Sequence, residues 1–157
     1  MKIYFWSVGK PHESYVKDGV EQFTKRISHY FPVEWKIFPS AKNADKLSQN
    51  EIKKTESQTI LNALQNDDIL IALDEYGKQW SSPELSVFIQ QRANESAKNI
   101  IFLIGGAYGL DDSIIKRCNY KWSLSKLVFP HQLVRLILSE QVYRACTIIR
   151  NEKYHHS

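Results

Sequence analysis

Two short apolar runs constrain the fold of this chain more than any other feature. Ile100–Ile104 and Ile69–Leu73 are each five residues long and contain no polar side chain. Both are too short for a typical helix, and the run from Ile100 is rich in β-branched and aromatic residues, so they predict strands buried on both faces. Such strands need helices above and below their sheet, which indicates an α/β fold.

Strand patterns alternate with helical patterns along the rest of the chain. Strands are predicted at Lys2–Val8, Val33–Phe38, Ile69–Leu73, Ile100–Ile104 and Tyr120–Leu124. Helices are predicted at Glu13 to about Ser28, Asn50 to Leu64, Ser81 or Ser82 to about Ala93, Asp111 or Asp112 through Lys116, and Pro130 to about Ile149. The polar segments Pro39–Ser48 and Asp74–Lys78 are expected to be loops. This alternation predicts a mostly parallel sheet with helices on both faces, whose ligands bind at the carboxyl ends of the strands.

Three helices carry patterns that predict what their faces contact. The first has apolar and aromatic residues at helical spacing, which we expect in the core: Tyr15, Val16, Val20, Phe23 and Ile27. In the second, the cluster Lys53, Lys54 and Glu56 is expected to face water. The last helix has more apolar residues than one stripe needs: Leu133, Val134, Leu136, Ile137 and Leu138. We therefore expect a second subunit to cover part of it, which makes the protein a homodimer, with the central buried helix of a monomer as the alternative.

Length and composition predict one domain. The chain has 157 residues, 43% of them hydrophobic, so residues 1–157 are expected to form a single domain. No apolar run approaches the ~18 residues of a membrane span, and we expect a cytoplasmic protein without membrane contact. Cys118 and Cys146 have neither metal-ligand spacing nor the density of a disulfide scaffold, so both thiols are expected to be reduced and no metal is expected.

A glycine-rich loop follows the strand at Ile100–Ile104. Gly105, Gly106 and Gly109 allow positive φ or a close approach of the backbone to a ligand. The loop has neither the Lys-Ser/Thr ending of a P-loop nor the pattern GxGxxG, so a phosphate or dinucleotide site has little support. Taken alone, the motif is compatible with an ordinary turn as well as with a ligand cradle.

Basic charge is concentrated in the same part of the chain. Residues 116–157 contain eight Lys or Arg and two Glu, whereas the first 115 residues carry a net charge of −2. Such clustering favours a polyanionic partner such as RNA, with a solvated basic face as the alternative.

Longer motifs identify a family. The chain contains IGGAYGL, then WSLSKLVFPHQLVRLILSEQVYRA, then a tail with Tyr-His, after the start MKIYFWSVGK and the central segment IALDEYGK. Over its whole length it resembles the bacterial large-subunit ribosomal RNA methyltransferase H family, which belongs to the SPOUT, or α/β-knot, methyltransferases. The resemblance implies a C-terminal trefoil knot and a homodimer formed through the last helix.

The resemblance also implies a cofactor and a reaction. The cofactor is S-adenosylmethionine, bound in the knot by Leu73, Gly105, Gly106, Leu124, Ser125, Lys126, Leu127, Val128 and Phe129. The reaction is methyl transfer to N3 of a pseudouridine in 23S ribosomal RNA, which requires alignment, loss of the N3 proton and a pocket for an unstacked base. Neutral backbone groups and apolar side chains suit the adenine of this cofactor, and no phosphate-binding lysine is needed.

Five polar side chains are candidates for the substrate side of the site. Arg135, Tyr154 and His155 are the catalytic candidates, and His131 and Arg144 are expected to bind substrate. All except Arg135 have a structural alternative: His131 can cap a helix, Arg144 can pair with Glu140 at i,i+4, and the residues from Tyr154 can be a frayed end. The sequence does not identify the general base.

Two other functions fit parts of the sequence. One is a noncatalytic ribosome-binding or RNA-binding module of the same fold, and the other is a small-nucleotide-binding protein whose glycine loop holds a phosphate. Binding of S-adenosylmethionine distinguishes the three hypotheses.

Overall fold

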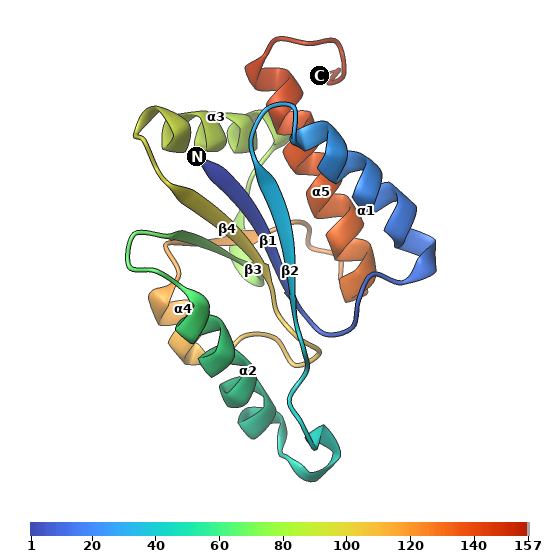
Figure 1. Cartoon of the computed structure of the whole chain (residues 1–157), viewed down its shortest axis with the longest axis vertical. Coiled ribbons are helices and arrows are strands. Elements are labelled where there is room, and N and C mark those ends of the chain that lie inside the picture. The colour runs from blue at the N-terminus through green and yellow to red at the C-terminus, as the bar shows by residue number, and fades with distance from the viewer. Residues whose placement is uncertain (157) are drawn as a thin grey trace.

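A computed structural model describes residues 1–156 (Figure 1). Ser157, the last residue of the expected domain, lies outside the described residues. Five parallel strands form one sheet in the order β2-β1-β4-β3-β5. The strands are β1 (Lys2–Val8), β2 (Val33–Phe38), β3 (Ile69–Gln79), β4 (Asn99–Ile104) and β5 (Tyr120–Ser123). The helices are α1 (Ser14–Ile27), the 3-10 turn η1 (Ala44–Lys46), α2 (Gln49–Ala63), α3 (Ser82–Asn94), α4 (Asp112–Arg117) and α5 (His131–Ile149).

The central strand β4 carries the apolar run that constrained the fold. It lies between β1 and β3. Phe102 of β4 is paired with Phe5 of β1 on one side and with Ile71 of β3 on the other. All residues from Ile100 to Ile104 are buried. Because side chains on both faces need apolar cover, helices must pack on both sides of this strand.

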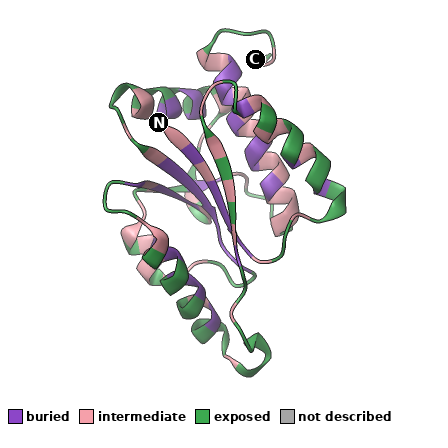
Figure 2. Cartoon of the chain, viewed as in Figure 1, coloured by how far each residue is buried: buried purple, intermediate pink, exposed green. Residues whose placement is uncertain are grey.

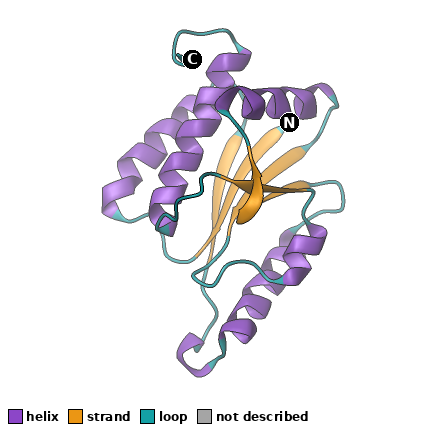
Figure 3. Cartoon of the chain, turned by 180° about the vertical axis from the view of Figure 1, so that it is seen from behind, coloured by secondary structure: helices purple, strands orange, loops and turns teal. Residues whose placement is uncertain are grey.

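Two apolar clusters provide that cover. One joins α1, α3 and α5 to the sheet through residues such as Ile27, Leu85 and Leu138. The other joins α2 and α4 to the opposite face through Ile60 and Ile114. Figures 1 and 3 show the two helical layers from opposite sides of the sheet. The predicted α/β fold with helices on both faces is therefore confirmed, while the trefoil knot stays a prediction.

The prediction that Asp74–Lys78 is a loop was wrong, because β3 continues to Gln79. Its second part pairs with β5, with Lys78 opposite Trp122, after an irregularity that follows Leu73. Gly77 makes this pairing possible, since a Cβ there would lie 2.7 Å from the backbone carbon of Lys121. Polar residues suggested a loop because this part of the strand is largely exposed.

Two expectations about helix faces were also wrong. Tyr15 is 60% exposed instead of lying in the core, although Val16, Val20 and Ile27 of the same helix are buried as expected. Glu56, expected in water, is only 8% exposed. Tyr15 is exposed although the next residue, Val16, is buried, so the two side chains lie on different faces of the first turn of α1. Glu56 is buried because α2 approaches the glycine loop at this residue.

Helix α5 packs against both α1 and α3. Figure 2 shows that buried and half-buried residues extend along its length. Leu138 is fully buried, whereas Leu133, Val134, Leu136 and Ile137 are half-buried. The apolar residues that suggested a homodimer thus keep part of their surface exposed in one chain, and the dimer stays a prediction.

The remaining composition-based expectations concern cysteines and membranes. Both cysteines are free; Cys146 is buried, which raises the pKa of its thiol to about 12, and burial also raises the pKa of Cys118. Within residues 1–156, no helix is long and apolar enough to cross a bilayer.

Candidate functional site

The ends of three neighbouring strands converge on one pocket. Leu73 comes from β3, Gly105 and Gly106 follow β4, and Leu124 follows β5. The pocket is lined by eight of the nine residues predicted to bind the cofactor: Leu73, Gly105, Gly106, Leu124, Ser125, Leu127, Val128 and Phe129. Lys126, the ninth, is exposed and lies outside the lining. The structure thus places the predicted residues together, although their role stays a prediction.

The glycine loop leaves no room for side chains at its first two positions. A Cβ on Gly105 would lie 2.9 Å from Leu110 Cδ2 and 3.2 Å from the carbonyl carbon of Gly109. Gly109 has a φ of +82°, and its amide donates to the carbonyl of Gly106 at 3.0 Å, which closes the turn. The backbone of residues 105–109 therefore forms one wall of the pocket.

A second loop, residues 124–129, forms the opposite wall. Ser123 Oγ donates to the carbonyl of Ser125 at 3.0 Å, and the amide of Leu127 donates to Ser125 Oγ at 3.0 Å. These bonds fix a turn that leaves Leu127 71% and Val128 84% exposed. Two neighbouring apolar side chains in water indicate a surface that something else covers.

The chemistry of the lining favours a cationic or neutral ligand. It is mostly apolar and backbone, with Asp74 and Glu75 as acidic groups at the end of the regular part of β3. Among the described residues that line this pocket there is no lysine or arginine. The two carboxylates would repel a phosphate, and no lysine or arginine of the lining would bind it, which disfavours the small-nucleotide hypothesis.

A buried carboxylate lies behind the glycine loop. The oxygens of Glu56, on α2, lie 2.8 and 2.9 Å from the position that a Cβ on Gly106 would take. Burial raises the pKa of this carboxyl. The carboxyl thus fills the space behind Gly106 and prevents that loop from moving toward α2.

We expect Glu56→Gln to stabilise the protein at pH 7.5. A folded-state pKa above the unfolded value means that the native protein binds more protons, so its stability falls as the pH rises from the unfolded pKa through the folded one. The amide of the glutamine side chain carries no charge, so burying it avoids the desolvation cost of the Glu56 carboxylate. Thermal unfolding should show a higher Tm for Glu56→Gln at pH 7.5, with a smaller difference at pH 4.5. A lower Tm at pH 7.5 would show instead that the carboxylate is stabilised by the loop.

His131 belongs to the same pocket, at the first residue of α5. The N-cap position is taken by Pro130 without a side-chain cap, so the capping alternative for His131 was wrong. Burial, and then the charge of Arg135, lower the pKa of His131. The helix N-terminus also disfavours a positive charge there. The imidazole is therefore neutral at pH 7 and can accept a proton.

Arg135 lies one turn further along α5 and points away from the cofactor pocket. Its side chain is 1% exposed; Nε donates to Ser7 Oγ at 3.1 Å, and Nη1 lies 3.3 Å from His12 Nδ1. Because arginine has no acceptor, Nη1 donates and His12 is unprotonated at Nδ1. Burial, and then Arg135, lower the pKa of His12 as well.

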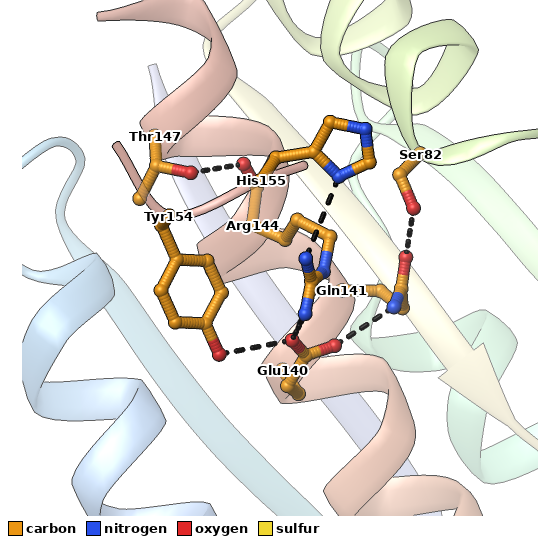
Figure 4. Close-up of polar contacts among 7 residues, drawn as sticks. All are labelled: Ser82, Glu140, Gln141, Arg144, Thr147, Tyr154 and His155. Carbon is orange, nitrogen blue, oxygen red and sulfur yellow. Dashed lines mark hydrogen bonds and ion pairs between the residues drawn. The ribbon is translucent and has the colours of Figure 1, made fainter. Parts of the chain in front are cut away.

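The remaining candidates lie around Glu140, in the middle of α5 (Figure 4). Glu140 Oε1 accepts hydrogen bonds from Arg144 Nη2 at 2.6 Å and from the Tyr154 hydroxyl at 3.0 Å. Arg144 Nη1 lies 3.4 Å from His155 Nδ1. We call Glu140, Arg144, Tyr154 and His155 the tail cluster. The pairing alternative for Arg144 is confirmed, and the frayed-end alternative was wrong, because Tyr154 also packs its ring 4.7 Å from that of Tyr143.

The tail cluster and the pocket are far apart within one chain. His131 and Arg144 are thirteen positions apart on α5, so their backbones are separated by about 20 Å along the helix axis. Burial, and then the bond to Glu140, raise the pKa of Tyr154, so its phenol stays protonated and serves as a donor. The chain thus does not bring its own tail to its own pocket.

Comparison with known proteins places the chain in a family. The family described as "Predicted SPOUT methyltransferase" matches residues 1–155. The chain belongs to the SPOUT methyltransferase family. Three relatives named ribosomal RNA large subunit methyltransferase H are similar over nearly the full length: that of Cytophaga hutchinsonii is 50% identical, covering 99% of this chain and 100% of the relative. Those of Christiangramia forsetii and Parabacteroides distasonis are 42% and 40% identical, each covering 99% of both proteins.

Several residues of this SPOUT protein's site were not predicted from the sequence. Asp74 and Glu75 directly follow an apolar run, which was the available signal, but the polar stretch was taken for a loop. Ser7 and His12 reach Arg135 only through the pairing of distant elements. No group of three or more His, Cys, Asp or Glu side chains within residues 1–156 could hold a metal ion.

Proposed function

We propose that this SPOUT protein transfers a methyl group from S-adenosylmethionine to N3 of a pseudouridine in 23S ribosomal RNA of the large subunit, in the cytoplasm. The observation that carries the proposal is the pocket at the carboxyl ends of three parallel strands, lined by apolar and backbone groups, two acids and His131, with no lysine or arginine among the described residues. The full-length similarity to relatives named ribosomal RNA large subunit methyltransferase H supports the choice of RNA.

The lining fits the proposed cofactor. Leu73, Leu127 and Phe129 offer apolar cover for an adenine ring, and the loop backbones at Gly105 and Ser125 offer hydrogen-bonding groups for its edge. Asp74 and Glu75 complement a positive charge. When bound, S-adenosylmethionine supplies an electrophilic methyl group on a sulfonium centre.

His131 is the residue best placed to accept the N3 proton. It lines the pocket and is held neutral by burial and by Arg135, which acts as a positioning residue. The unprotonated imidazole nitrogen would take the proton from N3, and the electron pair left on N3 would accept the methyl group that the cofactor would supply. No covalent bond to the protein is needed.

In the proposed function, the tail cluster of one subunit acts at the pocket of the other subunit. None of Arg144, Tyr154 and His155 lines the pocket of its own chain. Arg144 lies about 20 Å from His131 along α5, and the Tyr154 hydroxyl binds Glu140, nine positions after His131. A two-fold dimer with α5 at its interface would bring the partner's tail to the exposed side of this pocket. Leu127 and Val128 are exposed there in one chain, and the tail would cover them. We propose that Tyr154 and His155 act there in catalysis and that Arg144 binds RNA.

Calorimetry and a transfer assay test the function. The wild-type protein is titrated with S-adenosylmethionine, with ATP as the control ligand. It is then incubated with labelled cofactor and large ribosomal subunits lacking the modification, and the nucleosides are separated by mass. Cofactor binding together with N3-methylpseudouridine supports the proposal. A folded protein that binds ribosomal particles but no cofactor favours the noncatalytic RNA-binding module, and preference for ATP favours a nucleotide-binding protein.

Replacing His131 is expected to slow transfer and change its pH profile. The lowered pKa of His131 predicts a wild-type rate that falls only below about pH 6.5, where the imidazole becomes protonated. In His131→Asn, kcat should drop at least about 100-fold and the fall in acid should disappear. Cofactor affinity, measured by calorimetry, controls for damage to the pocket. A variant that keeps the wild-type acid limb would exclude His131 as the base.

A further inference from the structure

A second cleft adjoins the cofactor pocket on the other side of the glycine loop. It lies between the end of β1, the start of α1, Gly106 and the start of α5, and its volume is about 480 Å³. Gly106 and His131 line both cavities. His131 is the one titratable side chain among the described residues that faces both. The size suits a nucleotide-sized ligand, since small-molecule pockets run from about 300 to 1,000 Å³.

The cleft contains the groups that bind single-stranded nucleic acid. Tyr15, at its rim, exposes most of its ring to water, and Lys10 is exposed beside it. Arg135 lies at its base, with Nη2 3.7 Å from where a Cβ on Gly9 would be. Glu13 is the one acid in the described lining. Its backbone amide donates a hydrogen bond to Gln132 Oε1 at 2.9 Å, which links the starts of α1 and α5. Exposed aromatic rings stack on unpaired bases, and lysines bind phosphates.

The turn that presents Lys10 is built into the sheet. Gly9 has a φ of +132°, and its amide donates to the carbonyl of Phe38 at 2.8 Å, which links the ends of β1 and β2. A side chain at Gly9 would be strained at this φ and would contact Arg135. The Val8–Lys10 turn therefore has a fixed position at the edge of the cleft, although the cofactor pocket does not use it.

We propose that this cleft binds the unpaired RNA nucleotide that is methylated, with Tyr15 stacking on its base or on a neighbouring base and Lys10 binding a backbone phosphate. The inference rests on the proposed function and assigns the side from which the RNA enters. The base reaches His131 from one side of the glycine loop while the cofactor pocket lies on the other. The two ligands thus meet at Gly106 and His131 without sharing the rest of their sites.

Four variants test the cleft. Tyr15→Ala removes the ring and Tyr15→Phe keeps it; Lys10→Ala removes the cation at the cleft, and Lys54→Ala removes an exposed cation from α2, on the opposite face of the sheet. The readouts are KM for large ribosomal subunits, kcat, cofactor affinity by calorimetry, and mass by light scattering. We expect Tyr15→Ala and Lys10→Ala each to raise KM about tenfold, as for the loss of one stacked base or one phosphate contact. Cofactor affinity and mass should not change, Tyr15→Phe should raise KM less than Tyr15→Ala because it keeps the ring, and Lys54→Ala should match the wild type.

The outcomes separate this inference from the proposed function. Wild-type protein that binds no cofactor or methylates no RNA overturns the proposed function, and the inference with it. If the wild type is active but Tyr15→Ala and Lys10→Ala keep the wild-type KM, the RNA does not enter this cleft and the proposed function stands. If Tyr15→Ala changes the mass of the protein in solution, the cleft is a subunit interface and the nucleotide site is overturned.

Discussion

A Gly105→Val protein is expected to fold and to lose S-adenosylmethionine binding. The new Cβ would lie 2.9 Å from Leu110 Cδ2 and 3.2 Å from the Gly109 backbone, and a valine adds two methyl groups beyond it. The loop must open to accept them, which destroys one wall of the pocket. We expect affinity to fall at least about 100-fold, or about 2.7 kcal/mol. The atoms nearest to the new Cβ belong to Leu110 and Gly109, after the end of β4, so thermal melting should stay within about 10 °C of the wild type.

Tyr108→Val is the matched control, because it places the same side chain in the same loop. Tyr108 is exposed and lies outside the lining of the cofactor pocket. Calorimetry should show wild-type affinity for this control. Full affinity in a well-folded Gly105→Val protein would mean that the glycine loop does not hold the cofactor, whatever the Tyr108 variant does.

Two inactive variants are expected to restore activity when they are mixed. Gly105→Val has a damaged pocket and an intact tail, and a protein truncated after Glu152 has an intact pocket but lacks Tyr154 and His155. If the partner's tail completes each pocket, a heterodimer has one working site. Random pairing of equal amounts then gives about a quarter of wild-type activity after co-refolding, because half of the dimers each contain one of two possible sites.

The control replaces the truncated partner by one that carries both changes. Mixing it with Gly105→Val leaves no intact pocket, so no activity should return. Light scattering on each protein and on the mixture establishes whether dimers form at all. A monomer mass would remove the homodimer, whereas dimers without restored activity would keep the homodimer and assign the tail to another role.

The sequence predicted the sheet well because its central strands are buried on both faces. The apolar run Ile100–Ile104 is stable only where both faces of the strand are covered, and it is buried there. The helix from His131 to Ile149 was predicted from Pro130 and the long apolar pattern after it. The pocket followed from topology, since parallel strands that end in glycines or polar residues bring those ends to one edge. Eight of nine predicted cofactor residues line it for this reason.

Local patterns failed where a distant element decides the environment. The polar residues after Leu73 form a strand because β5, some 45 positions later, pairs with them across Gly77. Glu56 is buried because α2 approaches the glycine loop, and its own neighbours in sequence, which are mostly polar, gave no sign of that. The catalytic role of Arg135 stays a prediction, but local patterns did not indicate its contacts with Ser7 and His12, which come from the opposite end of the chain.

The position of β1 in the sheet also bears on how the protein is made. β1 pairs with β2, about 30 residues later, but its other neighbour is β4, about 97 residues later, and α1 packs on α5 near the end of the chain. A ribosome that has released only the first 90 residues therefore holds a strand with an unpaired edge and a helix without its cover. We expect this chain to reach its native state only after synthesis is nearly complete, and to depend until then on chaperones or on the low aggregation tendency of its polar helices.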